Sequence, residues 1–153
     1  MTLHLVRHAV AMRRRDWTGA DDLRPLTQRG RRQAEALVDW LRPRAVSRVV
    51  SSPSVRCVDT VHPFAAAAGL ALSTRDDLRE GSGLAVLALL RSIASENVVV
   101  CSHGDVLLEL LDALAGHARA VNGPSLDTFA KGAVWVVDGV PDDVVATYEA
   151  PLA

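Results

Sequence analysis

Aromatic residues are scarce in this chain of 153 residues: they make up 4% of it, against 49% for all hydrophobic residues. A core of this composition must be built mainly from aliphatic Val, Leu and Ala side chains. Long apolar runs are also lacking, because none approaches the ~18 residues that a membrane-spanning helix requires. Residues 1–4 have neither the basic nor the apolar region of a signal peptide. We therefore expect a soluble, cytoplasmic protein without a membrane partner.

The chain also has few cysteine and lysine residues and a small net charge. The two cysteines, Cys57 and Cys101, do not make a disulfide framework. Lys131 is the only lysine, since the other sixteen basic residues are arginine. The formal net charge of −1 argues against a general role in binding nucleic acid or a membrane surface. The length is typical of one domain, which we expect to extend over residues 1–153.

Short apolar runs alternate with segments of helical periodicity along the chain. Strands are predicted at residues 3–7, 47–51, 70–73 and 97–101. Helices are predicted from a Thr27 cap to residue 41, from Pro53 to residue 68, and over 84–95 and 105–115. Residues 133–137 and 144–148 predict a terminal antiparallel hairpin. This alternation predicts an α/β fold: a three-layer α/β/α sandwich around a mostly parallel sheet.

Polar side chains suited to phosphate chemistry follow three of the predicted strands. Arg7 and His8 end the first, Ser52 and Arg56 follow the second, and His103 follows the third. The carboxyl ends of parallel strands meet at one edge of a sheet, where ligands bind. Guanidinium groups hold phosphate oxygens, a neutral imidazole can attack phosphorus, and a helix N-terminus favours an anion. The sequence therefore predicts an oxyanion pocket at this edge.

These residues resemble, in the same order, those of the histidine phosphatase superfamily, which also contains the phosphoglycerate mutases. The resemblance covers roughly residues 3–137, and the short length is most similar to the small SixA-like branch of phosphohistidine phosphatases. It implies the phosphoglycerate mutase-like fold. The motifs that carry it are Leu5-Val6-Arg7-His8-Ala9, Arg24-Pro25-Leu26-Thr27 with Gly30, Ser51-Ser52-Pro53 with Arg56 and Thr60, and Ser102-His103-Gly104.

The resemblance implies a catalytic role for four of the matched residues. His8 would be the nucleophile, neutral on the attacking nitrogen, with its other ring nitrogen donating to a backbone carbonyl. Arg7, Arg56 and a protonated His103 would hold the phosphoryl oxygens, and no metal or other cofactor is needed. Further contacts to the substrate are expected from Arg13, Arg14, Ser52 and Gly104.

The general acid has two candidates. Glu80 lies in the loop region where the mutase-like branch keeps its acid, and Asp105 lies two residues after His103. Either carboxyl would need a raised pKa to donate a proton near neutrality. The chain departs from the family at Ala9, where most members have glycine, and the extra methyl group could crowd the bound phosphate.

The sequence is compatible with several classes of substrate. Phosphohistidine on a protein is the first expectation, from the SixA-like branch, and a small phosphorylated metabolite is the alternative. The segment around Lys131 and Trp135 is also similar to phosphatase domains fused to Nudix hydrolases, which points to nucleotides, and Arg13–Arg15 would suit these. A third possibility is a phosphate-binding module without catalysis.

A metal site is not expected. His4 and His8 share one face of the first strand, but at ~3.3 Å per residue they lie about 13 Å apart and cannot bind one ion together.

Overall fold

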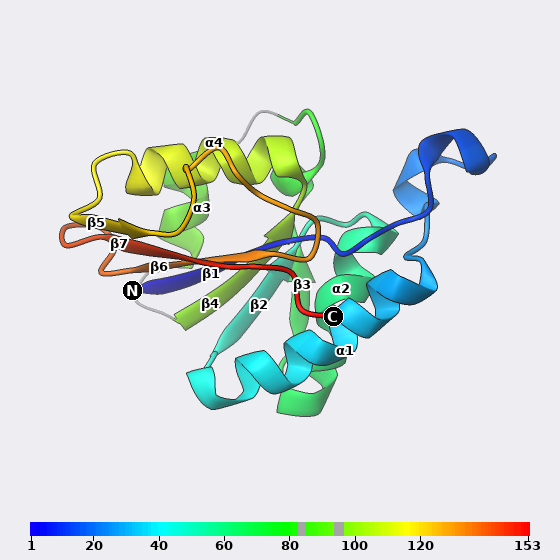
Figure 1. The fold of residues 1–153 in the computed structure, drawn as a ribbon, viewed down its shortest axis with the longest axis horizontal. Helices are drawn as coiled ribbons and strands as arrows, with labels where there is room; N and C mark the ends of the chain where they lie inside the picture. The colour runs from blue at the N-terminus through cyan, green and yellow to red at the C-terminus, as the bar shows by residue number, and fades with distance from the viewer. Residues whose placement is uncertain (83–84, 94–96) are drawn as a thin grey trace.

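A computed structural model describes residues 1–82, 85–93 and 97–153 of the chain. The strands of these residues form one sheet in the order β3-β2-β4-β1-β6-β7-β5 (Figure 1). The strands are β1 (Thr2–Arg7), β2 (Arg48–Ser51), β3 (Leu72–Thr74), β4 (Asn97–Ser102), β5 (Ala120–Asn122), β6 (Val134–Asp138) and β7 (Val145–Glu149). The α-helices are α1 (Gln28–Leu41), α2 (Val55–Ala68), α3 (Val86–Ser92) and α4 (Gly104–Ala115).

The sheet is parallel in its first part and mixed in its second. Strands β3, β2, β4 and β1 run parallel to one another, in the order expected for strands linked by helices. Strand β6 is antiparallel to both β1 and β7, which confirms the predicted hairpin. Strand β5 was not predicted: it has three residues, none of them buried, and pairs in parallel with β7 at the sheet edge.

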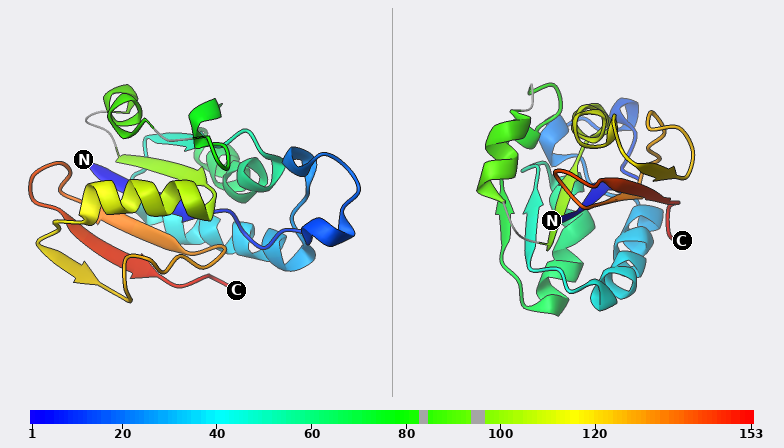
Figure 2. Two further views of the ribbon diagram at one scale, coloured as in Figure 1. Left: turned by 90° about the horizontal axis from the view of Figure 1, so that it is seen from above. Right: turned by 90° about the vertical axis from the view of Figure 1, so that its left-hand side faces the viewer.

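Helices cover both faces of the sheet, as the sequence predicts (Figures 1 and 2). On one face, α3 and α4 pack on a cluster that includes Leu3, Leu107 and the fully buried Trp135. On the other face, α1 and α2 pack on Val49, Val99 and their neighbours. The alternating side chains of β1 and β4 supply both clusters, so the central strands are buried on both sides. These layers make the three-layer α/β/α sandwich.

Two helix starts show how side chains set the boundaries. The Thr27 side chain accepts from the backbone N–H of Gly30, which confirms the predicted cap of α1. The predicted start of α2 at Pro53 is wrong, because the helix begins at Val55. The Ser54 N–H donates to Ser52 Oγ instead, and this bond holds Pro53 in a turn outside the helix.

The predicted helix over residues 84–95 is α3, with the narrower bounds Val86–Ser92. Residues 84, 94 and 95 of that prediction lie outside the described residues. None of the helices in the described ranges is long and apolar enough to cross a membrane.

Candidate active site

The ends of β1, β2 and β4 bring the predicted site residues to one edge of the sheet. The backbone ladder continues past each strand: His8 N–H donates to Ser102 O at 3.1 Å, and Ser52 N–H donates to Cys101 O at 2.9 Å. His8 and Ser52 are therefore placed by sheet hydrogen bonds rather than by free loops, and His103 directly follows the last residue of β4.

His8 is buried, with 5% of its surface exposed, and has one defined tautomer. Its Nδ1 lies 2.8 Å from the carbonyl oxygen of Ala9. A carbonyl can only accept, so Nδ1 carries the proton and Nε2 keeps a free lone pair. Burial lowers the pKa of His8 to about 3, and the nearby charges of Arg56 and Arg7 also disfavour a proton there. The imidazole is therefore neutral, with the ring orientation that the sequence predicted.

Ala9 does not crowd the pocket. Its N–H donates to Thr60 Oγ1 at 2.9 Å, and its methyl group packs in a small buried cluster with Ala11, Leu26 and Ala34. The alanine in place of glycine is thus accommodated, because its methyl group packs in this cluster.

The Arg7 guanidinium is held by a hydrogen bond to the backbone. One of its Nη atoms donates to the carbonyl of Phe129, while its buried Nε has no hydrogen-bond partner among the described residues. A Cβ atom on Gly104 would lie 3.0 Å from the Arg7 Cζ. Gly104 therefore lets the guanidinium lie against the start of α4, and a side chain there would displace it.

Arg56 is 1% exposed and lies in the first turn of α2. Its Nη1 donates to the backbone oxygen of Asp21 at 2.9 Å, and its Nη2 lies 3.1 Å from Asp21 Oδ2 and 3.3 Å from Glu80 Oε2. Its Nε also has no partner within the part of the chain that the structure describes. Buried donors are normally paired. Two guanidiniums with unpaired Nε–H groups therefore make a site that an oxyanion would complete.

His103 lies edge-on to His8, with 5.6 Å between the ring centroids. Its Nδ1 lies 3.3 Å from Arg56 Nη2, and its Nε2 lies 2.9 Å from Ser52 Oγ. A guanidinium only donates, so in this arrangement Nδ1 accepts and Nε2–H points to the serine. Ser52 is thus a hydrogen-bond partner of His103 and helps to orient its ring.

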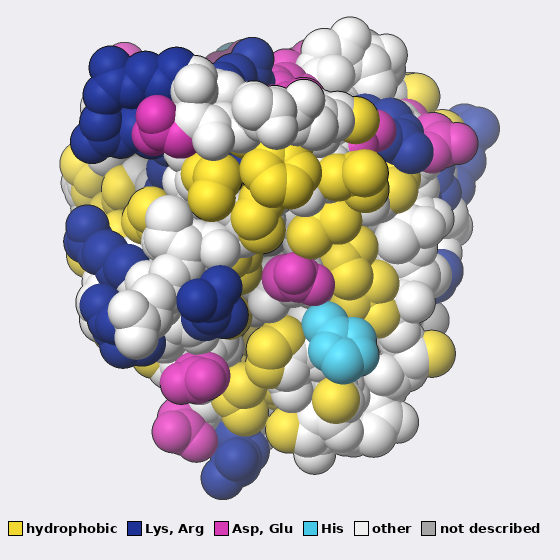
Figure 3. Space-filling view, turned by 90° about the vertical axis from the view of Figure 1, so that its right-hand side faces the viewer, with side chains coloured by type: hydrophobic (Ala, Val, Ile, Leu, Met, Phe, Trp, Pro, Cys, Tyr) yellow, Lys and Arg dark blue, Asp and Glu magenta, His cyan; other side chains and the backbone are white. Residues whose placement is uncertain are grey.

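One pocket of about 320 Å³ collects most of these groups, a volume in the range of small-molecule sites. Six of the predicted site residues line it: Arg7, His8, Arg13, Arg14, Arg56 and Glu80. Three others, Ser52, His103 and Gly104, are not among its lining residues. Arg24 and Lys131 also line it. These two were not predicted as site residues, although Arg24 lies in a matched motif and Lys131 is the only lysine. On the side of the molecule in Figure 3, basic side chains gather along one flank with acidic ones among them.

The two candidate acids differ in position. Glu80 lines the pocket, is 43% exposed on its side chain, and forms ion pairs with Arg14 and Arg56. Asp105 is exposed, lies outside the set of lining residues, and accepts from the Gly81 N–H at 2.9 Å. Of the two carboxylates, Glu80 lines the pocket, whereas Asp105 does not line it but is near enough to Arg7 for its charge to oppose the lowering of the pKa of Arg7 by burial.

Asp21 contacts three arginines of the site, and no sequence motif singled it out. Its carboxylate lies 3.1 Å from Arg24 Nε, 3.1 Å from Arg56 Nη2 and 3.7 Å from Arg14 Nε. Desolvation opposes its ionisation, but the hydrogen bond from Arg24 and the charges of Arg56 and Arg14 together lower its pKa. Asp21 therefore acts as a shared anionic partner that sets the spacing of three guanidiniums.

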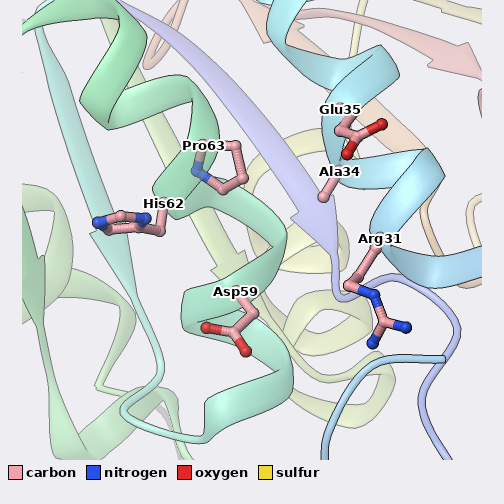
Figure 4. Close-up of a pocket in the computed structure, with 6 residues that line it drawn as sticks. All are labelled: Arg31, Ala34, Glu35, Asp59, His62 and Pro63. Carbon is pink, nitrogen blue, oxygen red and sulfur yellow. The ribbon is translucent and has the colours of Figure 1, made fainter. Parts of the chain in front are cut away.

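A second, separate pocket lies in the groove between α1 and α2 (Figure 4). None of its lining residues lines the catalytic pocket, and it mixes both signs of charge. The lining residues are Arg31, Ala34, Glu35, Asp59, His62 and Pro63. In the described ranges, no group of three or more His, Cys, Asp or Glu residues has the arrangement of a metal site.

Comparison with known proteins relates this arrangement to one family. Residues 3–85 match the histidine phosphatase superfamily, branch 1. A curated protein of Mycolicibacterium smegmatis, named 8-oxo-(d)GTP phosphatase, is 32% identical, and the alignment covers 98% of this chain and 48% of that protein. The chain therefore spans about half the length of this relative.

Solved structures show the same fold. The protein histidine phosphatase SixA complexed with tungstate has a TM-score of 0.75 at 21% identity, covering 100% of this chain and 97% of that one. A SixA protein from Nakamurella multipartitia has a TM-score of 0.73 at 27% identity, covering 99% and 96%. With the family match over more than half of its residues, the chain belongs to the histidine phosphatase superfamily, branch 1.

Proposed function

We propose that this protein is a phosphatase whose reaction passes through a phosphohistidine on His8. The observation that carries the proposal is the neutral His8 ring, with its proton fixed on Nδ1 by the Ala9 carbonyl. His8 lines the same pocket as Arg7 and Arg56, whose buried Nε–H groups have no partner in the described part of the chain. This is the arrangement that an in-line attack on a bound phosphoryl group requires.

In the first step, His8 Nε2 attacks phosphorus and the bond from phosphorus to the leaving group breaks. Arg7 and Arg56 hold the equatorial oxygens, whose charge they stabilise without reorganising at the moment of reaction. His103 contacts Arg56 and Ser52 through its two ring nitrogens and so supports this clamp. In the second step, a water molecule attacks the phosphohistidine, orthophosphate leaves, and Nε2 regains its lone pair. Positioning and charge stabilisation by the side chains supply the catalysis in both steps.

Glu80 would exchange protons with the leaving group and with the attacking water. As an anionic partner of Arg14 and Arg56, it is suited to accept a proton from water in the second step. Donating a proton in the first step would require it to be protonated beforehand, so leaving groups that need little protonation suit this site best.

Two substrate classes have support. The relative of 32% identity is named for a nucleotide, which favours a nucleotide or other small phosphorylated metabolite. The SixA structures favour phosphohistidine on a protein, by similarity of fold. We place the nucleotide first, because the arginine-rich pocket offers more cations than a single phosphoryl group uses.

The test is hydrolysis of p-nitrophenyl phosphate, nucleotides and a phosphohistidine protein by the wild type and His8→Ala, with EDTA present. We expect turnover by the wild type and a loss of at least three orders of magnitude in the variant, as for removal of a covalent nucleophile. Equal turnover by both proteins would refute the mechanism. Binding of phosphate without turnover of any substrate would identify a phosphate-binding module instead.

A further inference from the structure

The catalytic pocket holds more positive charge than one phosphoryl group needs. Six cationic side chains line it, together with the single carboxylate of Glu80. A terminal phosphate carries at most two negative charges near neutrality, fewer than the number of cationic side chains that line the pocket. Arg7 and Arg56 are the two that act on His8. The remaining cations are Arg13, Arg14, Arg24 and Lys131, which we call the outer cations.

Lys131 lies next to a residue, Gly132, that is hydrogen-bonded to the backbone of Arg7 and His8. The N–H of the following residue, Gly132, lies 3.1 Å from the carbonyl oxygens of both Arg7 and His8. Gly132 has φ +82, and a Cβ there would lie 3.0 Å from the Gln33 side chain, so the turn requires glycine. The position of the only lysine in the chain is thus tied to the strand end that presents His8.

The outer cations divide into paired and unpaired ones. Arg14 binds Glu80, and Arg24 binds Asp21. Lys131 and Arg13 have no ion pair within residues 1–82, 85–93 and 97–153. Burial lowers the pKa of Lys131, and the charges acting on it, from Arg7, Arg24, Arg14 and Arg56, are all positive. Arg13 and Lys131 thus line the same pocket as cations without an anionic partner in the described residues, which a second anionic group of a substrate could supply.

We propose that Arg13 and Lys131 form an outer anion subsite, which binds the second phosphate of a substrate that carries two adjacent phosphates, such as a nucleoside diphosphate. This inference rests on the proposed function, because it assumes that the terminal phosphate is transferred to His8. The inner clamp of Arg7 and Arg56 would hold that terminal phosphate, and the outer subsite would hold the phosphate attached to the leaving group.

The chemistry of such a substrate fits the protonation of the site. His8 Nε2 attacks the terminal phosphorus, and the bond from that phosphorus to the bridging oxygen breaks. The electron pair stays on the bridging oxygen, which becomes an oxygen of the departing monophosphate. Because a phosphate monoester has its second pKa near ~6, this group leaves without a proton from Glu80. Water then cleaves the phosphohistidine, and its proton passes to the Glu80 carboxylate.

The test compares a diphosphate with a monophosphate in the same proteins. ADP, GDP and p-nitrophenyl phosphate are assayed with EDTA for the wild type, Lys131→Met, Arg13→Met and Lys131→Arg. We expect each Met variant to lower the ratio of kcat/KM for the nucleotides to kcat/KM for the aryl ester about tenfold, the effect of one charge-assisted hydrogen bond. Lys131→Arg should keep most of the wild-type ratio. Arg15→Met is the matched control, because Arg15 is exposed in the same loop but does not line the pocket.

Inhibition measures the subsite without relying on nucleotide turnover. Pyrophosphate and orthophosphate compete against p-nitrophenyl phosphate, and Lys131→Met should raise the inhibition constant of pyrophosphate about tenfold more than that of orthophosphate. The proposal is overturned if the Met variants leave both ratios at the wild-type value, or if orthophosphate inhibits the wild type as strongly as pyrophosphate. Failure of the proposed function has a different signature, because His8→Ala would then retain its activity on the aryl ester.

Discussion

At the scale of single residues, burial decides the chemistry of the site. His8 is neutral because it lies among cations in the protein interior, and one carbonyl selects its tautomer. Arg56 is just as buried, and its guanidinium binds one carbonyl and two carboxylates. A neutral imidazole beside guanidinium groups therefore follows from where each side chain is buried and what it contacts.

The pKa of His8 can be measured directly. Imidazole NMR of the ligand-free protein should show the Nδ1–H tautomer with no protonation between pH 8 and pH 5, because burial lowers the pKa to about 3. Exposed His62 provides the internal comparison within the same spectra. A midpoint for His8 near its ordinary value of 6.5 would contradict the geometry described above.

Asp21 should be a positioning residue whose charge matters more than its size. In Asp21→Asn, the backbone carbonyl still binds Arg56, but the anionic contacts to Arg24 and Arg56 are lost. We expect kcat/KM for p-nitrophenyl phosphate to fall about tenfold, since a charge-assisted bond is weakened, with Asp21→Glu restoring part of it. Asp16→Asn, in the exposed turn of the same loop, is the control. Equal effects of the two Asn variants would show that Asp21 has no special role.

At the scale of elements, apolar strands and the residues just beyond them were readable from the sequence. The runs that form β1, β2 and β4 are buried on both faces, so their ends, and thus Arg7, His8 and His103, could be placed. The start of α2 could not be predicted from the sequence, because the hydrogen bonds of Ser52 to Ser54 and to His103 form only in the folded chain. Strand β5 was missed because three exposed residues carry no periodicity.

The start of α4 offers an element-level test. In Gly104→Ala, the new Cβ would lie 3.0 Å from Arg7 Cζ and push the guanidinium out of place. The helix itself should tolerate alanine, which has the higher helix propensity. We therefore expect kcat to drop at least tenfold while the thermal unfolding midpoint stays within a few degrees, as measured by calorimetry. A large loss of stability with unchanged kcat in the remaining folded protein would contradict this role.

At the scale of the whole molecule, the pocket unites segments far apart in the chain. Lys131 reaches it through the turn before β6, and Arg24 through the loop after β1. Sequence spacing does not reveal such contacts, which is why these cations and Asp21 were not predicted while the strand-end residues were. The family motifs located the phosphoryl clamp, and only the folded chain shows the charge that surrounds it.

Buried neutral histidines also tie stability to pH. Burial is the largest cause that lowers the pKa of both His4 and His8, so the unfolded chain takes up protons that the folded one does not. The contribution of each histidine to stability is complete above the unfolded pKa of 6.5 and is lost as the pH falls from there towards the lowered folded pKa, which is about 3 for His8. The free energy of unfolding in urea should therefore decrease between pH 6.5 and pH 5, by up to ~1.4 kcal/mol per pH unit for each histidine.

The control for this linkage is His8→Asn, which should have a smaller slope of stability against pH over the same interval. Carboxylates such as Asp21, with lowered pKa values, affect stability only at lower pH. Stability that is flat or rises from pH 6.5 to pH 5 would contradict the burial of neutral imidazoles.

The most direct test of the central claim is to trap the covalent intermediate. The protein is mixed with p-nitrophenyl phosphate, quenched at alkaline pH to preserve phosphohistidine, digested, and analysed by mass spectrometry. The account predicts one added phosphoryl group on the peptide containing His8, localised to that residue and absent from His8→Ala. A phosphoryl group on another residue, or full turnover by His8→Ala with no labelled peptide, would contradict it.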